Sequence, residues 1–447
     1  MATLVVNGGR RLEGRITPSA NKNAVLPVLC ASLLTAEPVT LRGVPDVTDV
    51  RKLLEFFAAL GSEVEADFSS GVVRLVHGPA LDPTRARLPS GMRSTIMLIP
   101  ALLHRFGRAV LEEDAKGCTL GIREIDPHID IFRAFGARVS VEPEGLVITA
   151  PKVFAPVRHW FDYASVTGTE NFLMCAAVAG GASRLVNAAC EPHVQEMCRF
   201  LALMGVGISG VGASTLEVAG RPELTGATYA FAEDFHEIAT FLALGAITGG
   251  AVEVRNSAPE QFALLDRTFA KFGVQVAHFG GWSRIRPDSV LKVRASFTPH
   301  LLQKVEAAPW PYVPADLLPI FVALGARAEG SVMFWNKVYE GALGWTSELA
   351  KFGAHAVTCD PHRIITYGGR ELEPAEVESP YIIRAAIALL MLAASIEGRS
   401  TIRNAAPIRR AHPGFVENLQ RLGADVTWAP DLSVEGARQH AMEGAAG

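Results

Sequence analysis

The stretch IDIFRAFGARVSVEP, residues 129–143, is typical of a helix that ends at a glycine and is followed by a strand. Five similar stretches recur along the chain: LLEFFAALGSEVEAD (53–67), MCRFLALMGVGISGV (197–211), LDRTFAKFGVQVAHF (265–279), TSELAKFGAHAVTCD (346–360) and VENLQRLGADVTWAP (416–430). Their shared glycine is expected just after a helix, because glycine accepts a left-handed backbone conformation. Self-similarity at a period of about 70 residues predicts a fold built from repeated units.

A second, more apolar helix is expected before each of these stretches. The six helices are NAVLPVLCASLL (23–34), MRSTIMLIPALL (92–103), TENFLMCAAVAG (169–180), FHEIATFLALGAI (235–247), ADLLPIFVALGA (315–326) and IRAAIALLMLAA (383–394). Helices that are apolar on nearly all sides lie in the centre of a domain. We therefore expect six strand–helix–strand–helix–strand–strand units, arranged as two α/β domains of three units, with the chain crossing between them near residues 224–235.

Composition and charge limit the classes of function. The chain has 447 residues and a formal net charge of −4, so it lacks the strongly basic face that nucleic-acid binding requires. Arg384 interrupts its most apolar helix, so we expect no membrane span. The six cysteines include no CxxC pair, which favours a reducing, cytoplasmic location. The oligomeric state cannot be inferred from these features.

Basic residues open several of the buried helices. Lys22, Arg93 and Arg384 stand where the helix dipole favours an anion, and Arg123 and Arg410 occupy similar turns of other repeat segments. If the repeat gathers these helix starts, they form a site for an anion carrying phosphate and carboxylate groups. The alternative is that they are scattered surface cations.

Two further residues are candidates for chemistry. Cys118 lies in a polar, glycine-containing stretch beside cations that lower a thiol pKa, although it is also compatible with a structural role. Asp316 follows a proline-rich turn at a helix start, where it is either a cap or a carboxylate base. The motif GVGISG (205–210) follows a helix rather than a strand, so it is interpreted as a helix end. No metal is expected, because His128, His236 and His412 lack ligand spacing.

Six motifs together resemble the enolpyruvyl transferase family, which contains UDP-N-acetylglucosamine 1-carboxyvinyltransferase and 5-enolpyruvylshikimate-phosphate synthase. They are NKNAVLPVLCASLL (21–34), GMRSTIMLIPALL (91–103), GCTLGIREIDPHI (117–129), SVTGTENFLMCAA (165–177), NAACEPHVQEM (187–197) and PADLLPIF (314–321). The resemblance implies an inside-out α/β barrel of six βαβαββ units with the active site between two domains. It implies domains at 22–231 and at 1–21 plus 232–447, and a catalytic loop at about 112–125.

The resemblance also implies the donor chemistry. The enolpyruvyl group of phosphoenolpyruvate (PEP) passes to a hydroxyl group with release of phosphate, and neither a metal nor a cofactor takes part. Lys22, Arg123 and Arg410 are implied to hold the phosphate of PEP, and Arg384 its carboxylate. Cys118 is implied as the acid at C3 of PEP and as the thiol that fosfomycin alkylates. Lys22, Cys118, Arg410 and Asp316, which receives the hydroxyl proton, are thus the implied catalytic residues.

The implied acceptor is a uridine nucleotide. Asn23 and Arg93 are implied to contact it, the stretch 123–128 to hold the uracil and residues 165–167 its phosphate. The implied acceptor residues are therefore Asn23, Arg93, Arg123, Asp126, His128, Ser165, Val166, Thr167 and Asp316.

This sequence departs from the cell-wall enzyme at several positions. A family Phe-Glu-Asn-Arg motif reads YEGA here, so that Ala342 replaces an arginine that pairs with Arg384, and Lys337 is a candidate substitute. Ile382, Phe235 and Ala315 replace an aspartate, an arginine and a threonine of the family. These differences favour a smaller acceptor, the 3′-hydroxyl of UMP, as in nikkomycin- and polyoxin-type antibiotic pathways. UDP-N-acetylglucosamine is the alternative acceptor, and a non-catalytic nucleotide-binding relative is the second alternative.

Overall fold

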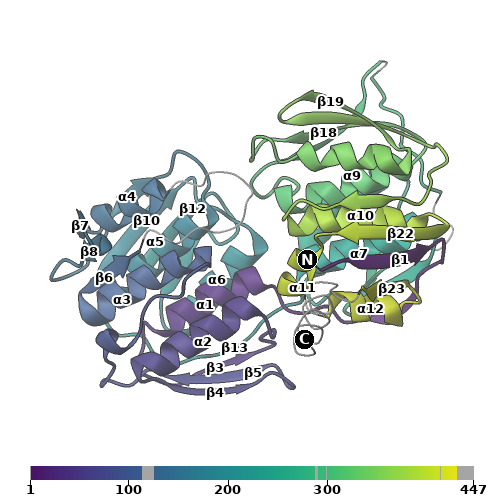
Figure 1. The fold of residues 1–447 in the computed structure, drawn as a ribbon. Helices are drawn as coiled ribbons and strands as arrows, with labels where there is room; N and C mark the ends of the chain where they lie inside the picture. Colours follow the sequence, from purple (N-terminus) through teal and green to yellow (C-terminus); the bar gives the residue numbers. More distant parts are fainter. Residues whose placement is uncertain (1, 113–124, 287–289, 299, 413, 430–447) are drawn as a thin grey trace, which may run out of the picture.

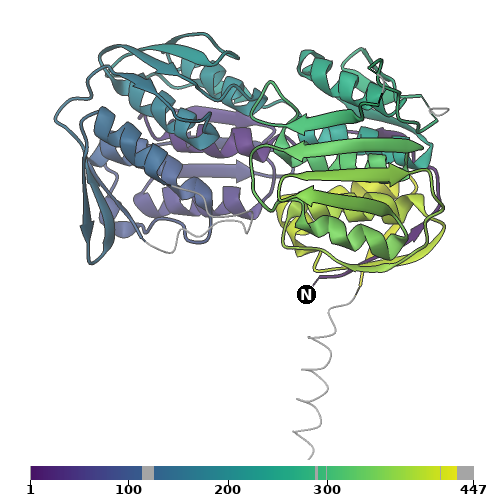
Figure 2. The same cartoon turned by 90° about the horizontal axis from the view of Figure 1, so that it is seen from above.

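The computed structural model describes residues 2–112, 125–286, 290–298, 300–412 and 414–429. Two lobes of similar size lie side by side (Figures 1 and 2). Cys118, Arg123 and most of the expected catalytic loop fall outside the described residues.

The first lobe contains the elements from α1 to β13. Its helices are α1 (Lys22–Ser32), α2 (Thr48–Leu60), η1 (Pro83–Arg85), η2 (Arg93–Leu98), α3 (Ile99–Phe106), α4 (Asp126–Ala134), α5 (Val166–Val178) and α6 (Pro192–Leu203). Its strands are β3 (Val39–Arg42), β4 (Glu63–Asp67), β5 (Val72–Val76), β6 (Arg108–Leu111), β7 (Arg138–Glu142), β8 (Gly145–Thr149), β9 (Arg158–Trp160), β10 (Gly181–Val186), β11 (Gly207–Ser209), β12 (Thr215–Gly220) and β13 (Thr228–Ala230).

The second lobe contains the remaining elements. Its helices are α7 (Phe235–Thr248), η3 (Pro259–Phe262), α8 (Ala263–Lys271), η4 (Ala315–Leu317), α9 (Leu318–Arg327), η5 (Gly344–Phe352), α10 (Ile383–Ser395), α11 (Ala406–Ala411) and α12 (Phe415–Arg421). Its strands are β1 (Leu4–Gly8), β2 (Glu13–Ile16), β14 (Ala251–Arg255), β15 (Val276–Phe279), β16 (Trp282–Ile285), β17 (Gln303–Ala307), β18 (Gly330–Asn336), β19 (His355–Asp360), β20 (Arg363–Gly368), β21 (Glu376–Glu378), β22 (Gly398–Arg403) and β23 (Asp425–Trp428).

The described strands form six small sheets, one for each predicted unit. In the unit that runs from β9 to β12, β9 and β10 are parallel and flank α5, while β12 pairs antiparallel with both β10 and β11. The same order recurs in β17–β18–β20–β19, and the sheet β6–β8–β7 has three described strands. This arrangement is the predicted strand–helix–strand–helix–strand–strand unit.

The chain passes between the two lobes twice, and the strands before each crossing pair within the lobe that the chain is leaving. β2 pairs in parallel with β14 of the second lobe, and β13 pairs in parallel with β3 of the first. The chain therefore crosses once between β2 and α1 and again between β13 and α7. β1 lies between β22 and β23, so the N-terminal strand completes the last sheet of the second lobe, as the family resemblance implied.

The apolar cores lie inside the lobes and follow this division. One cluster of buried apolar residues extends from Val25 to Ala227, and the other combines Leu4–Ile16 with residues 235–426. The central helices of the second lobe, α7, α9 and α10, contact one another (Figure 1). We keep 22–231 and 1–21 plus 232–447 as the proposed domain bounds.

Two of the predicted central helices begin differently from the prediction. Residues 93–98 and 315–317 form the 3-10 turns η2 and η4 before α3 and α9 begin. Pro100 and Pro319 are the second residues of the two α-helices and lie in their first turns. Proline is favoured there because its missing N–H is not needed in the first turn.

Two motifs interpreted from the sequence also have a clear structure. In GVGISG, α6 ends before Gly205, whose φ is +96°, and the residues that follow form strand β11 rather than a helix. The interpretation as a helix end is therefore confirmed. None of the described helices is long and apolar enough to cross a membrane.

Candidate active site

Four of the residues predicted for the site line one cavity between the lobes. Lys22 and Asn23 reach it from the start of α1 in the first lobe, Asp316 from η4 and Arg384 from α10 in the second. The cavity, which we call the interlobe cavity, has a volume of about 160 Å³. Residues more than 350 positions apart in sequence thus meet at the junction of the two lobes.

Lys22 lies at the start of α1. Asn21 caps this helix, because its Oδ1 atom accepts a hydrogen bond of 2.9 Å from the backbone N–H of Asn23. The ammonium group of Lys22 lies 3.6 Å from Asp49 Oδ2 in α2, and both side chains are largely buried. The apolar part of α1 is buried from Ala24 onward, so the charge lies where the core meets the cavity.

Arg384 is the second residue of α10. The residue before this helix, Ile382, provides no side-chain cap, so the N–H groups of the first turn are free to face a ligand. Within the described part of the chain, Nη1 of Arg384 is buried and has no hydrogen-bond partner. Unsatisfied buried donors are uncommon in native proteins, so this one indicates a position where an acceptor binds.

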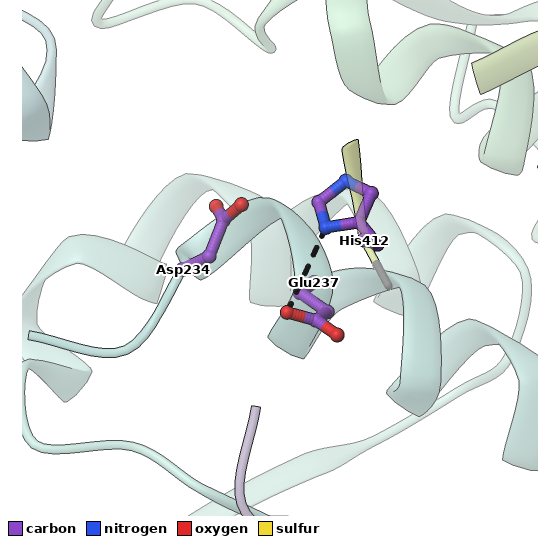
Figure 3. Close-up of side chains that lie close together, drawn as sticks. All are labelled: Asp234, Glu237 and His412. Carbon is purple, nitrogen blue, oxygen red and sulfur yellow. Dashed lines mark ion pairs between the residues drawn. The ribbon is translucent and has the colours of Figure 1, made fainter. Parts of the chain in front are cut away.

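A buried group of ionisable residues lies beside Arg384. Asp234 and Glu237 stand at the start of α7, and His412 follows α11 (Figure 3). Burial alone would raise the pKa of Asp234, but the hydrogen bond from His236 and the nearby positive charges outweigh it and hold the pKa below its usual range. Burial and the charge of Asp234 raise the pKa of Glu237 to about 7, whereas burial and Arg384 lower the pKa of His412 to about 3.

We assign no cation to this group, although ligand atoms of Asp234, Glu237 and His412 lie within 4.8 Å of one another. Oδ1 of Asp234 already accepts hydrogen bonds from the backbone N–H of His236 (2.9 Å) and faces its Nδ1 at 3.1 Å. Oε2 of Glu237 accepts hydrogen bonds from the backbone and hydroxyl of Ser19. Arg384 supplies the positive charge that a metal would otherwise bring.

Several residues that line the interlobe cavity are apolar. They include Ala342, Leu343, Trp345, Ile382 and Ile383. Ala342 and Ile382 are two of the positions where this sequence departs from the family, and Ala315, a third, also lines the cavity. The substitutions therefore change the surface that a ligand contacts.

Two other sequence interpretations do not fit the cavity. Lys337, the candidate substitute for the missing arginine, instead pairs with Glu306 (2.6 Å) and lies over the ring of Trp335. It is absent from the described residues that line the cavity. Phe235 is buried and packs against the rings of His236 and Trp310, so its difference from the family lies in the interior.

Asn23 and Asp316, two of the residues predicted for the acceptor, line the interlobe cavity, whereas His128, Ser165 and Thr167 lie in the first lobe and are not among the described residues that line it. His128 Nε2 lies 3.2 Å from Thr167 Oγ1, and the amide of Asn171 donates to its Nδ1 at 2.9 Å. Burial, together with the charge of Arg93, lowers the pKa of His128 to about 3, so the ring is neutral. Because Nδ1 accepts a hydrogen bond, the ring proton lies on Nε2 and is donated to Thr167. Ser165 caps α5 through the N–H of Gly168.

The remaining predicted residues that the structure describes do not line the interlobe cavity. Asp126 begins α4 and is exposed, and Val166, the first residue of α5, is half-buried. Arg410 is exposed near the end of α11 and does not line the interlobe cavity, whereas His412, two residues later, does. The positions of Cys118 and Arg123 are not described.

Comparison with known proteins identifies the family. Residues 6–419 match the family described as EPSP synthase (3-phosphoshikimate 1-carboxyvinyltransferase). The chain belongs to this enolpyruvyl transferase family. It is 33% identical over 428 residues to UDP-N-acetylglucosamine 1-carboxyvinyltransferase of Borreliella burgdorferi, covering 95% of this chain and 99% of that protein. The Bradyrhizobium diazoefficiens enzyme of the same name is 35% identical, with coverage of 96% and 98%.

Solved structures support the same fold. The enolpyruvyl transferase NikO from Streptomyces tendae superposes with a TM-score of 0.81 and 24% identity, covering 96% of this chain and 99% of NikO. EPSP synthase from Acinetobacter baumannii has a TM-score of 0.74 and 17% identity, with coverage of 96% and 100%. This family member is thus a transferase of the enolpyruvyl class with the inside-out α/β barrel fold, and the resemblance inferred from the motifs is confirmed.

Asp234, Trp345 and His412, which line the cavity, and Glu237, which lies beside two of them, were not predicted as site residues. Asp234 and Glu237 were visible in the sequence only as charges at a helix start, and His412 only as a histidine without ligand spacing. Trp345 gave no signal, because a tryptophan near a helix start is usually part of the core. Their joint position depends on the packing of α7, α10, α11 and η5, which local sequence patterns do not encode.

Proposed function

We propose that this protein transfers the enolpyruvyl group of PEP to a hydroxyl group of a uridine nucleotide and releases phosphate. The observation that carries the proposal is the meeting of Lys22 and Asn23 from one lobe with Asp316 and Arg384 from the other in the interlobe cavity. Two cations and the uncapped start of α10 suit a ligand with phosphate and carboxylate groups. No metal or cofactor is included in the proposal.

The proposed reaction has two steps. In the first, the acceptor oxygen bonds to C2 of PEP, C3 gains a proton from Cys118, and Asp316 takes the proton of the acceptor hydroxyl group. In the second, the bond between C2 and the phosphate oxygen breaks and C3 returns a proton to the Cys118 thiolate, which restores the double bond. Between the steps C2 is a tetrahedral carbon, and positive charge develops at C2 in the transition state of each step, so electrostatic stabilisation by the site is the main expected source of rate.

Lys22, Arg123 and Arg410 are the proposed phosphate ligands in this scheme, and Arg384 binds the carboxylate. Because Arg410 points to solvent in the unliganded chain, its role requires α11 to approach the ligand. Closure of two lobes on their ligands is a common way to complete such a site.

We propose the 3′-hydroxyl of UMP as the acceptor. The support is that Ala315, Ala342 and Ile382, which replace polar residues of the family, all line the interlobe cavity. A site without polar partners for a sugar substituent gains little affinity from that substituent, so it does not favour a ligand that carries it. UDP-N-acetylglucosamine is the second candidate, because the full-length relatives at 32–35% identity carry its name.

Phosphate release in the presence of PEP tests the proposal. The protein is incubated with PEP and UMP, UDP-N-acetylglucosamine or no acceptor, and the product is analysed by mass spectrometry. We expect release with UMP and a product heavier by one enolpyruvyl group. Release only with UDP-N-acetylglucosamine would move the function to the second candidate. Binding of a uridine nucleotide without any release would instead support a non-catalytic relative.

A further inference from the structure

Two buried nitrogen atoms around the interlobe cavity lack hydrogen-bond partners in the described part of the chain. They are Nη1 of Arg384 and Nε1 of Trp345. Trp345 is 5% exposed, and both residues belong to the lining of the cavity. Burying a polar group without a partner destabilises the fold unless a ligand or water satisfies it.

The two residues come from neighbouring elements. Arg384 is the second residue of α10, Trp345 is the second residue of η5, and these elements contact each other. Neither helix has a side-chain cap at its start. The N-terminal ends of both helices therefore contribute residues to the lining of the cavity, as Ala342 does.

The chemistry of the two donors restricts the ligand. A guanidinium and an indole N–H donate hydrogen bonds and accept none, so a group that satisfies both must be a hydrogen-bond acceptor. Ala342, Leu343, Ile382 and Ile383 contribute apolar surface to the same cavity. In such surroundings a hydrogen bond to an ionised acceptor is strengthened.

We propose that the indole N–H of Trp345 and the guanidinium of Arg384 together hold the carboxylate of PEP. This inference rests on the proposed function and names the partner that takes the place of the arginine missing at Ala342. A carboxylate offers two oxygen atoms in one plane, one for each donor. The phosphate of PEP then points toward Lys22 at the α1 end of the cavity.

A neutral donor suits this position for an electrostatic reason. Lys337, the other candidate, is already engaged by Glu306 and by the rings of Trp335 and Tyr312. The positive charge of Arg384 already balances the single negative charge of a carboxylate. Trp345 adds direction to the contact without bringing a second cation next to Arg384.

Calorimetry with PEP and vinyl phosphate, which is PEP without its carboxylate, tests the proposal. Trp345→Phe keeps a large aromatic ring but removes the N–H group, and Lys337→Met is the matched control. We expect Trp345→Phe to bind PEP about tenfold or more weakly, since a hydrogen bond to a charged group is lost. Its affinity for vinyl phosphate and the PEP affinity of Lys337→Met are expected to stay at the wild-type level.

Equal loss for both ligands would mean that Trp345 shapes the site without contacting the carboxylate, and would overturn the proposal. Wild-type PEP affinity in Trp345→Phe, or a loss in Lys337→Met alone, would overturn it as well. A wild-type protein that binds no PEP would contradict the proposed function itself, and the carboxylate assignment with it. The two failures are therefore distinguishable.

A spectroscopic measurement covers the case in which Trp345→Phe is unstable. The chain has six tryptophans, so 15N-tryptophan labelling gives a small set of indole N–H resonances. Five variants, each with one of the other tryptophans replaced by phenylalanine, each lose one resonance. The resonance that remains in all five belongs to Trp345. We expect this signal to move downfield on addition of PEP and to move little with vinyl phosphate. An unchanged signal at saturating PEP would rule out the contact.

Discussion

Lys22 and Asp49 form an ion pair of 3.6 Å at the point where α1 meets the interlobe cavity. The aspartate belongs to the first turn of α2, so the pair joins the starts of two helices in the first lobe. It holds the ammonium group beside the cavity before any ligand is present. A phosphate that binds there would compete with Asp49 for the same cation.

The first prediction follows from this competition. Replacing Lys22 with Met should weaken PEP binding and phosphate release by about 100-fold or more, because a charge-assisted contact is lost and Asp49 is left without its partner. Lys22→Arg should retain part of the activity. Steady-state phosphate release at several PEP concentrations is the measurement. Equal KM for PEP in Lys22→Met and wild type would contradict the role of Lys22.

The second prediction concerns Asp316, which lines the cavity from η4. If it takes the hydroxyl proton, Asp316→Asn should lower kcat by about 100-fold or more, the usual contribution of a general base. PEP affinity should change much less, because the carboxylate is not a proposed donor ligand. Asp82→Asn, at an exposed turn far along the chain, serves as the control. Loss of PEP binding with kcat preserved would contradict this assignment.

The repeat made most of the fold predictable from sequence. The glycines at 61, 136, 205, 273, 353 and 423 all have positive φ, so the local signal and the backbone agree. The pairing of β2 with β14 and of β13 with β3 was predictable only in part. A four-residue strand such as Glu13–Ile16 carries no information on which sheet it joins, because pairing depends on contacts with residues more than 200 positions away.

The site was predictable where charge and local structure coincide. Lys22 and Arg384 were conspicuous because they oppose the helix dipole at the start of an apolar helix, and both line the cavity. His412 and Trp345 were missed, since neither a buried histidine nor a buried tryptophan is unusual by itself. Their lack of hydrogen-bond partners becomes visible only when the surrounding elements are packed.

The third prediction concerns Thr167 and the acceptor. Thr167→Val removes the hydroxyl that lies 3.2 Å from Nε2 of His128 and leaves that N–H without its acceptor. Because His128 is buried and neutral, the ring should lose its fixed orientation and the uridine nucleotide should bind about tenfold more weakly. PEP affinity should be unaffected. Parallel titrations with UMP and PEP make the test, and equal weakening of both would indicate a general structural defect.

The fourth prediction links stability to pH through Glu196 in α6. Its Oε1 atom accepts a hydrogen bond of 3.0 Å from the backbone of Ala232, between β13 and α7 where the chain crosses. Burial raises the pKa of Glu196 to about 7. A carboxyl group whose pKa is higher in the folded state stabilises the fold below its unfolded value, near 4.5, and that stabilisation is lost as pH rises toward 7.

Glu196→Gln should remove this dependence. Relative to wild type, the variant should gain free energy of unfolding between pH 5 and 8, on the order of 2–3 kcal/mol for a shift of this size. Thermal unfolding at several pH values is the measurement, with the exposed Glu217→Gln as control. A constant difference between variant and wild type across this range would show that Glu196 does not titrate there.

The last prediction concerns the reaction with fosfomycin that the family resemblance implied for Cys118. Cys30, Cys175, Cys190 and Cys198 are buried, and burial raises the pKa of each, that of Cys190 to about 11 and that of Cys198 to about 12. They hold few thiolates at neutral pH and should not react. Cys359 is exposed, so it competes with Cys118 as the target. Cys118→Ser should therefore form no fosfomycin adduct, whereas Cys359→Ser should be modified and inactivated like wild type. Intact-protein mass spectrometry should find one adduct in wild type and in Cys359→Ser. Absence of the adduct in Cys359→Ser would show that Cys359, and not Cys118, is the residue that reacts.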